Sequence, residues 1–149
     1  MSDDFRDNLV TDDAEIRRIA ASARRVVVLG IKPDDHAAAA AHYVPAYLVE
    51  AGIEIVPVPV YYPEVTAILG QAVQRDLASI APPVDIVDVF RRSADVPAHV
   101  DDLIRLHPAV VWLQSGIRHA GAAEQLARAG IRVVQDRCLM VEHRLGKRR

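Results

Sequence analysis

The stretch RVVVLGIKP at residues 25–33 constrains the fold of this chain more than any other. Residues 26–29 are all apolar and three of them are valines, which predicts a strand buried on both faces, because such a strand has no solvent side that needs polar residues. Gly30 predicts a sharp turn, since a residue without a Cβ lets the main chain bend and lets a ligand approach closely. An alanine-rich helical run follows. This order predicts a phosphate-binding turn, with free N–H groups around Gly30 and at the helix N-terminus as donors.

The rest of the chain alternates between predicted strands and predicted helices. Runs rich in β-branched residues predict further strands over 53–60, 84–90, 109–113 and 131–135. Helical spacing of apolar residues predicts helices that begin at Thr11 and that span 37–52, 93–106, 119–130 and 136–144. Pro45 should move the start of the second helix to about His42, and residues 65–73 stay unassigned. We therefore expect right-handed βαβ crossovers and a three-layer, Rossmann-like α/β fold, with a five-stranded parallel sheet and helices on both faces.

The length of 149 residues is typical of one domain, and we expect residues 1–149 to form a single domain with flexible ends at about 1–10 and 145–149. A net charge of −2 favours neither nucleic acid nor a membrane surface as partner. No run approaches the roughly 18 apolar residues of a membrane span, and the acidic N-terminus is unlike a signal peptide. Cys138 is the only cysteine, which excludes an intramolecular disulfide. We expect a cytoplasmic protein that binds a small molecule; a protein partner or a homodimer stays open.

Ligands of an open parallel sheet bind beyond the carboxyl ends of its strands. In this sequence those ends carry cations, aromatic rings and glycines, which suit an anionic nucleotide because guanidinium groups bind phosphates and rings stack on a base. The predicted binding residues are Gly30, Ile31, Lys32, Val60, Tyr61, Phe90, Arg91, Arg92, Gln114, Ser115, Gly116 and Arg137. The fingerprint for a nicotinamide dinucleotide is not met, because Gly30 stands alone and residues 57–60 contain no carboxylate.

Each candidate residue also has a structural interpretation. Gly30 could serve only as a strand-ending turn, and Arg91 and Arg92 could pair with Asp88, Asp95 or solvent. Charged side chains are rarely buried among apolar neighbours unless they have a polar partner, so one of Asp85 and Asp88 could cap a neighbouring loop. The histidines share no metal-ligand spacing, and Cys138 fits a buried small residue better than a nucleophile. We therefore predict no catalytic residue and no metal site.

Three runs of the sequence resemble those of the small bacterial and archaeal CoA-binding proteins. They are VDIVDVFRR at 84–92, VWLQSGI at 111–117 and DRCLMVEH at 136–143. Those proteins are similar to the N-terminal CoA-binding domain of the succinyl-CoA synthetase alpha subunit, and the resemblance covers nearly the whole chain from about Thr11. It implies a five-stranded sheet that binds coenzyme A, with the pyrophosphate near 30–32 and the adenosine part between the segment after the second strand and 90–92. Residues 114–116 and 136–137 would complete the rim.

Two segments depart from the pattern of that family. In its first loop the family carries an arginine or lysine followed by proline and serine; this chain has the alanine run at 37–41 there. After its second strand the family carries Asn-Pro-Arg or Asn-Pro-Lys; this chain has Pro59, Val60 and Tyr61. The leading hypothesis is a protein that binds CoA or an acyl-CoA without catalytic activity of its own. One alternative is a small CoA-dependent transferase or reductase that uses His119, Cys138 or Asp88; another is an interaction protein with a degenerate nucleotide cleft.

Overall fold

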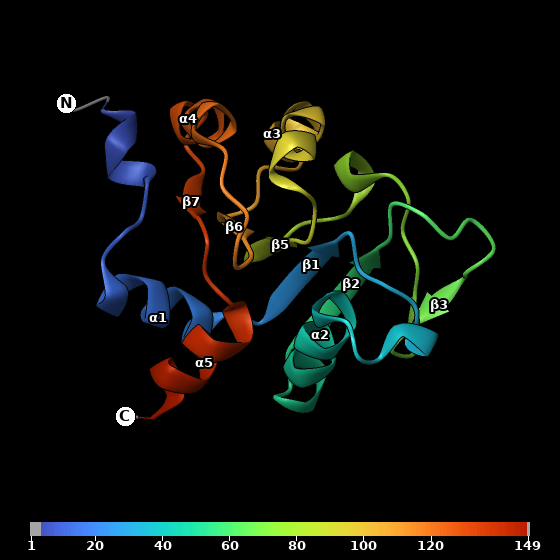
Figure 1. Ribbon diagram of the computed structural model, residues 1–149. Coiled ribbons are helices and arrows are strands. Elements are labelled where there is room, and N and C mark those ends of the chain that lie inside the picture. Colours follow the sequence, from blue (N-terminus) through green and yellow to red (C-terminus); the bar gives the residue numbers. More distant parts are fainter. Residues whose placement is uncertain (1–3, 149) are drawn as a thin grey trace.

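The computed structural model describes residues 4–148, and within this range five strands form one parallel sheet. In spatial order the strands are β2 (Glu54–Val58), β1 (Arg25–Leu29), β5 (Ile86–Val89), β6 (Val110–Leu113) and β7 (Arg132–Val134). The chain passes from β1 to β2 on one side and then crosses to β5 on the other side of β1 (Figure 1). This reversal places the topological switch point between β1 and β5, where ligands of such sheets usually bind.

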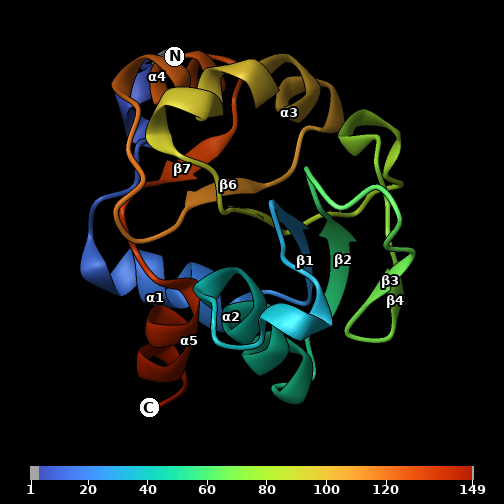
Figure 2. The same ribbon diagram turned by 45° about the vertical axis from the view of Figure 1, so that its right-hand side comes forward.

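Helices cover both faces of the sheet, which confirms the predicted three-layer α/β fold. On one face lie α3 (Val100–Leu106), preceded by a 3₁₀ helix over Ser93–His99, and α4 (Ala120–Arg128). On the other lie α1 (Asp13–Ser22), α2 (Ala40–Glu50) and α5 (Leu139–Lys147), with α1 and α5 packed against each other (Figures 1 and 2). No helix among the described residues is long and apolar enough to cross a membrane.

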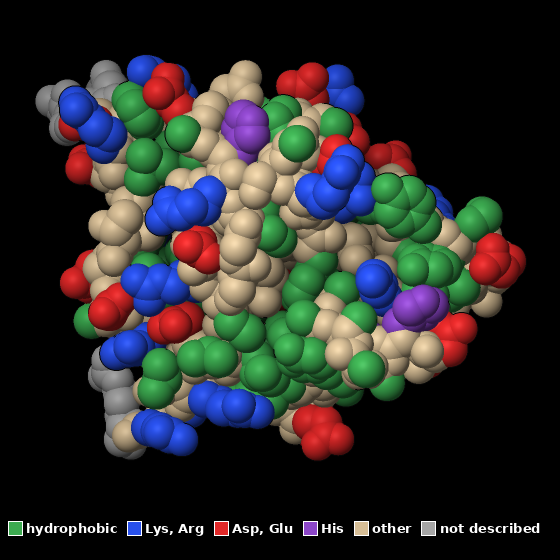
Figure 3. Space-filling model, in the orientation of Figure 1, with side chains coloured by type: hydrophobic (Ala, Val, Ile, Leu, Met, Phe, Trp, Pro, Cys, Tyr) green, Lys and Arg blue, Asp and Glu red, His purple; other side chains and the backbone are tan. Residues whose placement is uncertain are grey.

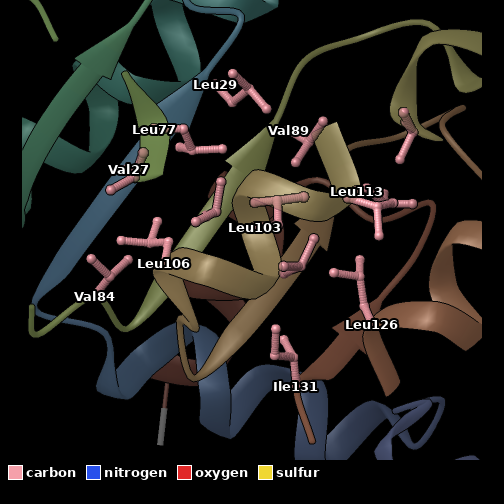
Figure 4. Packing of buried hydrophobic residues seen from close by; sticks show 14 of the residues in the cluster. Val27, Leu29, Leu77, Val84, Val89, Leu103, Leu106, Leu113, Leu126 and Ile131 are labelled. Carbon is pink, nitrogen blue, oxygen red and sulfur yellow. The ribbon is translucent and has the colours of Figure 1, made fainter. Parts of the chain in front are cut away.

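Each face of the sheet has its own hydrophobic core, because successive strand residues point to opposite faces. Figure 4 shows the core under α3 and α4, which contains Leu103 and Leu126 from these helices and Val89 from β5. The core on the other face contains the fully buried Trp112 and Val28. The β-branched runs of the sequence therefore form a sheet buried on both sides, as predicted for its first strand.

Helix α2 begins at Ala40, two residues before the predicted start at His42, and Pro45 lies inside it. Proline has no N–H, so it cannot donate to the carbonyl of Ala41, four residues earlier. The N–H of Lys32 donates to that carbonyl instead, at 3.1 Å. The helix thus tolerates Pro45 because the loop after β1 supplies the donor that is missing.

The unassigned segment contains a small antiparallel hairpin of β3 (Ala67–Ile68) and β4 (Gln71–Ala72). Its turn residues Leu69 and Gly70 both have positive φ, 52° and 75°, as a two-residue hairpin turn requires. Strands of two residues leave no periodicity to detect, and Leu-Gly is not a usual turn pair, so no local pattern predicted the hairpin. The hairpin lies beside β2 (Figure 2).

The described parts of both chain ends have contacts with the rest of the domain, and flexibility at 1–10 and 145–149 stays a prediction. The side chain of Asn8 donates to the Ala127 carbonyl at 2.9 Å, and the N–H of Val10 donates to the Val133 carbonyl at 2.9 Å. At the other end, α5 continues to Lys147, and a hydrogen bond of 2.8 Å joins Tyr47 to the buried His143. Residues 1–3 and 149 lie outside the described range.

Candidate functional site

The carboxyl ends of β1, β2 and β5 meet around a pocket of about 220 Å³ at the switch point of the sheet. Figure 3 shows Lys and Arg side chains beside hydrophobic ones on the right of the molecule, over the region where β1 and β2 end. The pocket is lined by Gly30, Ile31, Lys32, Val60, Tyr61, Tyr62, Phe90, Arg91, Arg92 and Asp95. The structure thus brings together the predicted residues that follow the first three long strands.

Gly30 directly follows β1 and lies against the main chain of Phe90, which directly follows β5. Its φ is 88°, and a Cβ at this position would lie 2.2 Å from the carbonyl oxygen of Phe90, so only glycine fits. The N–H of Gly30 donates to Val58 at 2.8 Å, and that of Lys32 donates to Ala41 at 3.1 Å. The prediction of free N–H donors around Gly30 is therefore wrong for these two residues, whose N–H groups already have partners within the chain.

Arg91 is the most firmly held cation of the pocket. Its Nε–H donates to Nε2 of His99 at 3.2 Å, its guanidinium lies 3.7 Å from Asp95 and 5.5 Å from the centre of the Tyr61 ring, and its side chain is only 15% exposed. Because Nε2 of His99 accepts this hydrogen bond, the imidazole is neutral there. Burial, and then the charge of Arg91, lower the pKa of His99, which favours the same neutral form.

Arg92 differs from Arg91 in its exposure. Its side chain is 83% exposed, and its Nε–H donates to Asp95 at 2.9 Å. This hydrogen bond raises the pKa of Arg92 and lowers that of Asp95. Both arginines therefore form ion pairs with Asp95, as the structural interpretation of these residues proposed. Both still line the pocket.

Sequence reasoning missed two residues of the pocket, Tyr62 and Asp95. Tyr62 has a φ of 63°, and its ring packs edge-on against that of His36, with 5.4 Å between centroids. The position of Tyr62 directly after Tyr61 was the only available signal. Asp95 could have been found from its spacing, because a carboxylate three residues after Arg92 is within reach in a helical turn.

The predicted residues after β6 and β7 lie outside this pocket. The buried Gln114 accepts the N–H of Leu139 at 2.9 Å, and the N–H of Gly116 donates to Asp136 at 2.6 Å. The side chain of Arg137 forms an ion pair with Asp13 at 2.7 Å. Ser115 is exposed beside Gly116. Within this structure these contacts fix the turns after β6 and β7, and binding of a ligand there stays a prediction.

The side chains considered for catalysis do not line the pocket. Nδ1 of His119 accepts the N–H of Ala122 at 3.0 Å and so caps α4. Asp88 is fully buried, and neither carboxyl oxygen has a hydrogen-bond partner among the described residues. Burial raises its pKa well above the ordinary value. Cys138 directly precedes α5, and no group of three or more metal-binding side chains occurs in residues 4–148.

Asp85 has the capping role that we predicted for one of the two aspartates. Its Oδ2 accepts the N–H groups of Arg24 and Arg25, at 2.8 and 2.9 Å. It therefore fixes the start of β1, at the end of the sheet opposite the pocket.

Comparison with known protein families shows which family the chain belongs to. Residues 24–144 match the family model described as "CoA binding domain", which covers most of the chain. The chain belongs to the CoA-binding domain family. This confirms the resemblance found in the three sequence runs, and the match includes every residue of the pocket in this CoA-binding domain.

Relatives of this CoA-binding domain cover nearly its whole length. The uncharacterized protein YneT of Bacillus subtilis (strain 168) is 33% identical over 134 residues, which is 90% of this chain and 96% of that protein. A Thermus thermophilus protein of known structure is 40% identical, with a TM-score of 0.81 over 91% of this chain and 99% of its own. A hypothetical protein from Pyrococcus horikoshii OT3 is 27% identical, with a TM-score of 0.79 over 91% and 92%.

Proposed function

We propose that this CoA-binding domain binds CoA or an acyl-CoA at the pocket between β1, β2 and β5, and that it catalyses no reaction by itself. The observation that carries the proposal is the position of Arg91. Its guanidinium is held by His99, Asp95 and Tyr61 directly beside Gly30, at the switch point of the sheet. A cation that is already ordered binds a phosphate at a smaller entropic cost than a mobile one.

The chemistry of the pocket fits the nucleotide half of CoA. Lys32, Arg91 and Arg92 supply positive charge for phosphates, and Tyr61 and Phe90 supply flat surfaces for a base. The volume of about 220 Å³ is below the roughly 300 Å³ at which pockets for drug-sized ligands begin. The pocket thus holds only part of CoA, and the remainder extends along the strand ends toward Gln114, Ser115, Gly116 and Arg137.

The part of the proposal that excludes catalysis is supported by the positions of the three side chains considered as catalytic groups. His119 caps a helix, Asp88 is buried inside the sheet and Cys138 lies beyond the pocket lining. A transferase or reductase needs an acid, base or nucleophile within reach of the bound ligand. A CoA-binding role in which the protein carries or senses the ligand, or presents it to a partner, needs none of these.

Ligand-dependent thermal stability and calorimetry test the proposal directly. CoA should stabilise the protein by about 2.7 kcal/mol at a hundredfold excess over its Kd. Dephospho-CoA should bind more weakly, because it lacks the 3′-phosphate that a guanidinium would bind, and NAD should have little effect. Equal responses to CoA and NAD, or no response to CoA, contradict the proposal. Acyl-CoA turnover by the isolated protein would support the enzyme alternative.

A further inference from the structure

One wall of the pocket is a loop, residues 59–65, that has no regular secondary structure. It contributes Val60, Tyr61 and Tyr62 to the pocket lining. The Tyr61 residue is 64% exposed, so burial does not fix its position. None of the residues of this loop is positively charged. The position of Tyr61 therefore depends on contacts made by the loop backbone and by its neighbours rather than on burial.

Arg75 binds this loop through four main-chain carbonyl groups. One guanidinium nitrogen, Nη1, donates to the carbonyl oxygens of Pro59 at 3.4 Å and Tyr61 at 3.0 Å, and Nη2 donates to those of Tyr62 at 2.7 Å and Val65 at 3.0 Å. A guanidinium is planar and keeps its charge, so its donors fix the relative positions of the groups that accept from them. A lysine would supply a point charge without this geometry.

The backbone around Arg75 is itself anchored to the sheet. The N–H of Gln74 donates to the carbonyl of Pro57, in β2, at 2.9 Å, and the N–H of Val73 donates to that of Thr66 at 3.0 Å. Arg75 thus extends from a fixed point at the base of the β3–β4 hairpin. The loop is therefore tied to the edge of the sheet at a second place, through the side chain of Arg75, in addition to its covalent link to β2.

We infer that Arg75 is a positioning residue for ligand binding, which holds the ring of Tyr61 against Arg91 so that a nucleotide base can stack there. The inference rests on the proposed function. Arg75 does not line the pocket, whereas the Tyr61 ring lies 5.5 Å from the Arg91 guanidinium. Arg75 therefore acts on the pocket from behind the loop, without contacting the ligand itself.

Arg25 provides a matched control at the opposite end of β1. Its Nη1 donates to the carbonyls of Ala81 and Pro83, at 2.6 and 2.8 Å, and its Nε–H donates to Glu54 at 2.8 Å. Arg25→Ala and Arg75→Ala each remove one positive charge and a set of hydrogen bonds to carbonyls. Only the second change touches the pocket loop, so a general loss of stability would appear in both variants.

The decisive experiment measures the Kd for CoA in the unaltered chain, Arg75→Ala, Arg25→Ala, Tyr61→Ala and the double variant Arg75→Ala/Tyr61→Ala. We expect Arg75→Ala to weaken binding about tenfold, equivalent to about 1.4 kcal/mol, and Arg25→Ala to leave it unchanged. If Arg75 acts through Tyr61, its removal has little further effect once Tyr61 is absent. Equal Kd values for Arg75→Ala and the unaltered chain, or additive effects in the double variant, overturn the inference.

A second readout needs no ligand. Chymotrypsin cleaves after tyrosine, and the bond between Tyr61 and Tyr62 should be cut several times faster in Arg75→Ala than in Arg25→Ala or the unaltered chain. Unchanged cleavage overturns the inference even if CoA binds. If the unaltered chain binds no CoA, the proposed function fails together with the ligand-binding part of the inference. The cleavage rates then still decide whether Arg75 holds the loop.

Discussion

Gly30 and Phe90 approach each other so closely that a Cβ on Gly30 would lie 2.2 Å from the Phe90 carbonyl oxygen. This contact joins the ends of β1 and β5, the two strands on either side of the switch point. It brings Arg91, the next residue along the chain, to the same point: its Cδ would lie 3.3 Å from that Cβ. The pocket therefore depends on the absence of a side chain at residue 30.

Gly30→Ala should destabilise the domain far more than Gly52→Ala. Both glycines have positive φ, 88° and 87°, but nothing lies within 4 Å of a Cβ at residue 52. The backbone strain of about 1 kcal/mol is common to both, and the overlap with Phe90 adds roughly 1–3 kcal/mol at residue 30. Urea unfolding of the two variants measures the difference. Equal losses of stability would show that the close contact has relaxed without cost.

Arg91→Ala should weaken CoA binding more than Arg92→Ala. Arg91 is 15% exposed and held on three sides, whereas Arg92 is 83% exposed and has an ion pair with Asp95. We expect a loss of about 1.5–3 kcal/mol for Arg91 and at most about 1 kcal/mol for Arg92. Calorimetric titration of both variants, with circular dichroism as a check of folding, tests this order. A larger effect of Arg92→Ala would reverse our assignment of the principal phosphate contact.

Asp88→Asn should stabilise the domain at neutral pH. Full burial raises the pKa of Asp88 above its unfolded value, so the folded state binds a proton that the unfolded state releases. Stability is then fully present below the unfolded pKa of about 3.9 and falls as pH rises toward the folded pKa, by up to about 1.4 kcal/mol per pH unit. Asparagine cannot ionise, so its advantage should grow over this range in unfolding measured at pH 4 to 8.

Asp85→Asn is the matched control for that measurement. Asp85 accepts two main-chain N–H groups, so its substitution should destabilise rather than stabilise. If Asp88→Asn also destabilises at pH 7, or if the difference from the unaltered chain does not change with pH, the buried carboxyl has a polar partner that the geometry does not show.

His99 should make the domain less stable in acid. Burial and the charge of Arg91 lower the pKa of His99, while Asp95 and Asp102 oppose this change. The unfolded state therefore takes up a proton near pH 6.5 that the folded state does not accept until lower pH, so stability falls as pH decreases through this interval. His99→Gln keeps an acceptor for Arg91 but does not titrate. Identical pH profiles of the variant and the unaltered chain between pH 5 and 7.5 would show that His99 is not perturbed.

The parallel sheet and its two helical layers were predictable because buried parallel strands leave long β-branched runs such as residues 84–90. The strand order was not predicted and comes from the structure. The hairpin over β3 and β4 was not, since two-residue strands carry no pattern. The start of α2 depended on a hydrogen bond from Lys32, a residue outside that helix. Local rules fail where a distant part of the chain supplies the missing donor.

The candidate site divides in the same way. The rule that parallel strands end at a common edge predicted that Gly30, Tyr61 and Arg91 lie together, and they line one pocket. The same rule placed Gln114 and Arg137 in the site, but their structural contacts are with Leu139 and Asp13, in helices α5 and α1. The ends of the strands can be predicted from sequence. Which helix residues form hydrogen bonds or ion pairs with the side chains at those ends cannot be predicted in this way.

Nuclear magnetic resonance of the ¹⁵N-labelled protein during titration with CoA tests the central claim most directly, because it locates the ligand on the folded domain. We predict that the largest amide shifts occur at Gly30, Ile31, Lys32, Tyr61 and Arg91, with smaller changes elsewhere. Saturable binding with its largest shifts on the outer faces of α2 and α5, or no shifts at all with CoA in excess, would contradict the account.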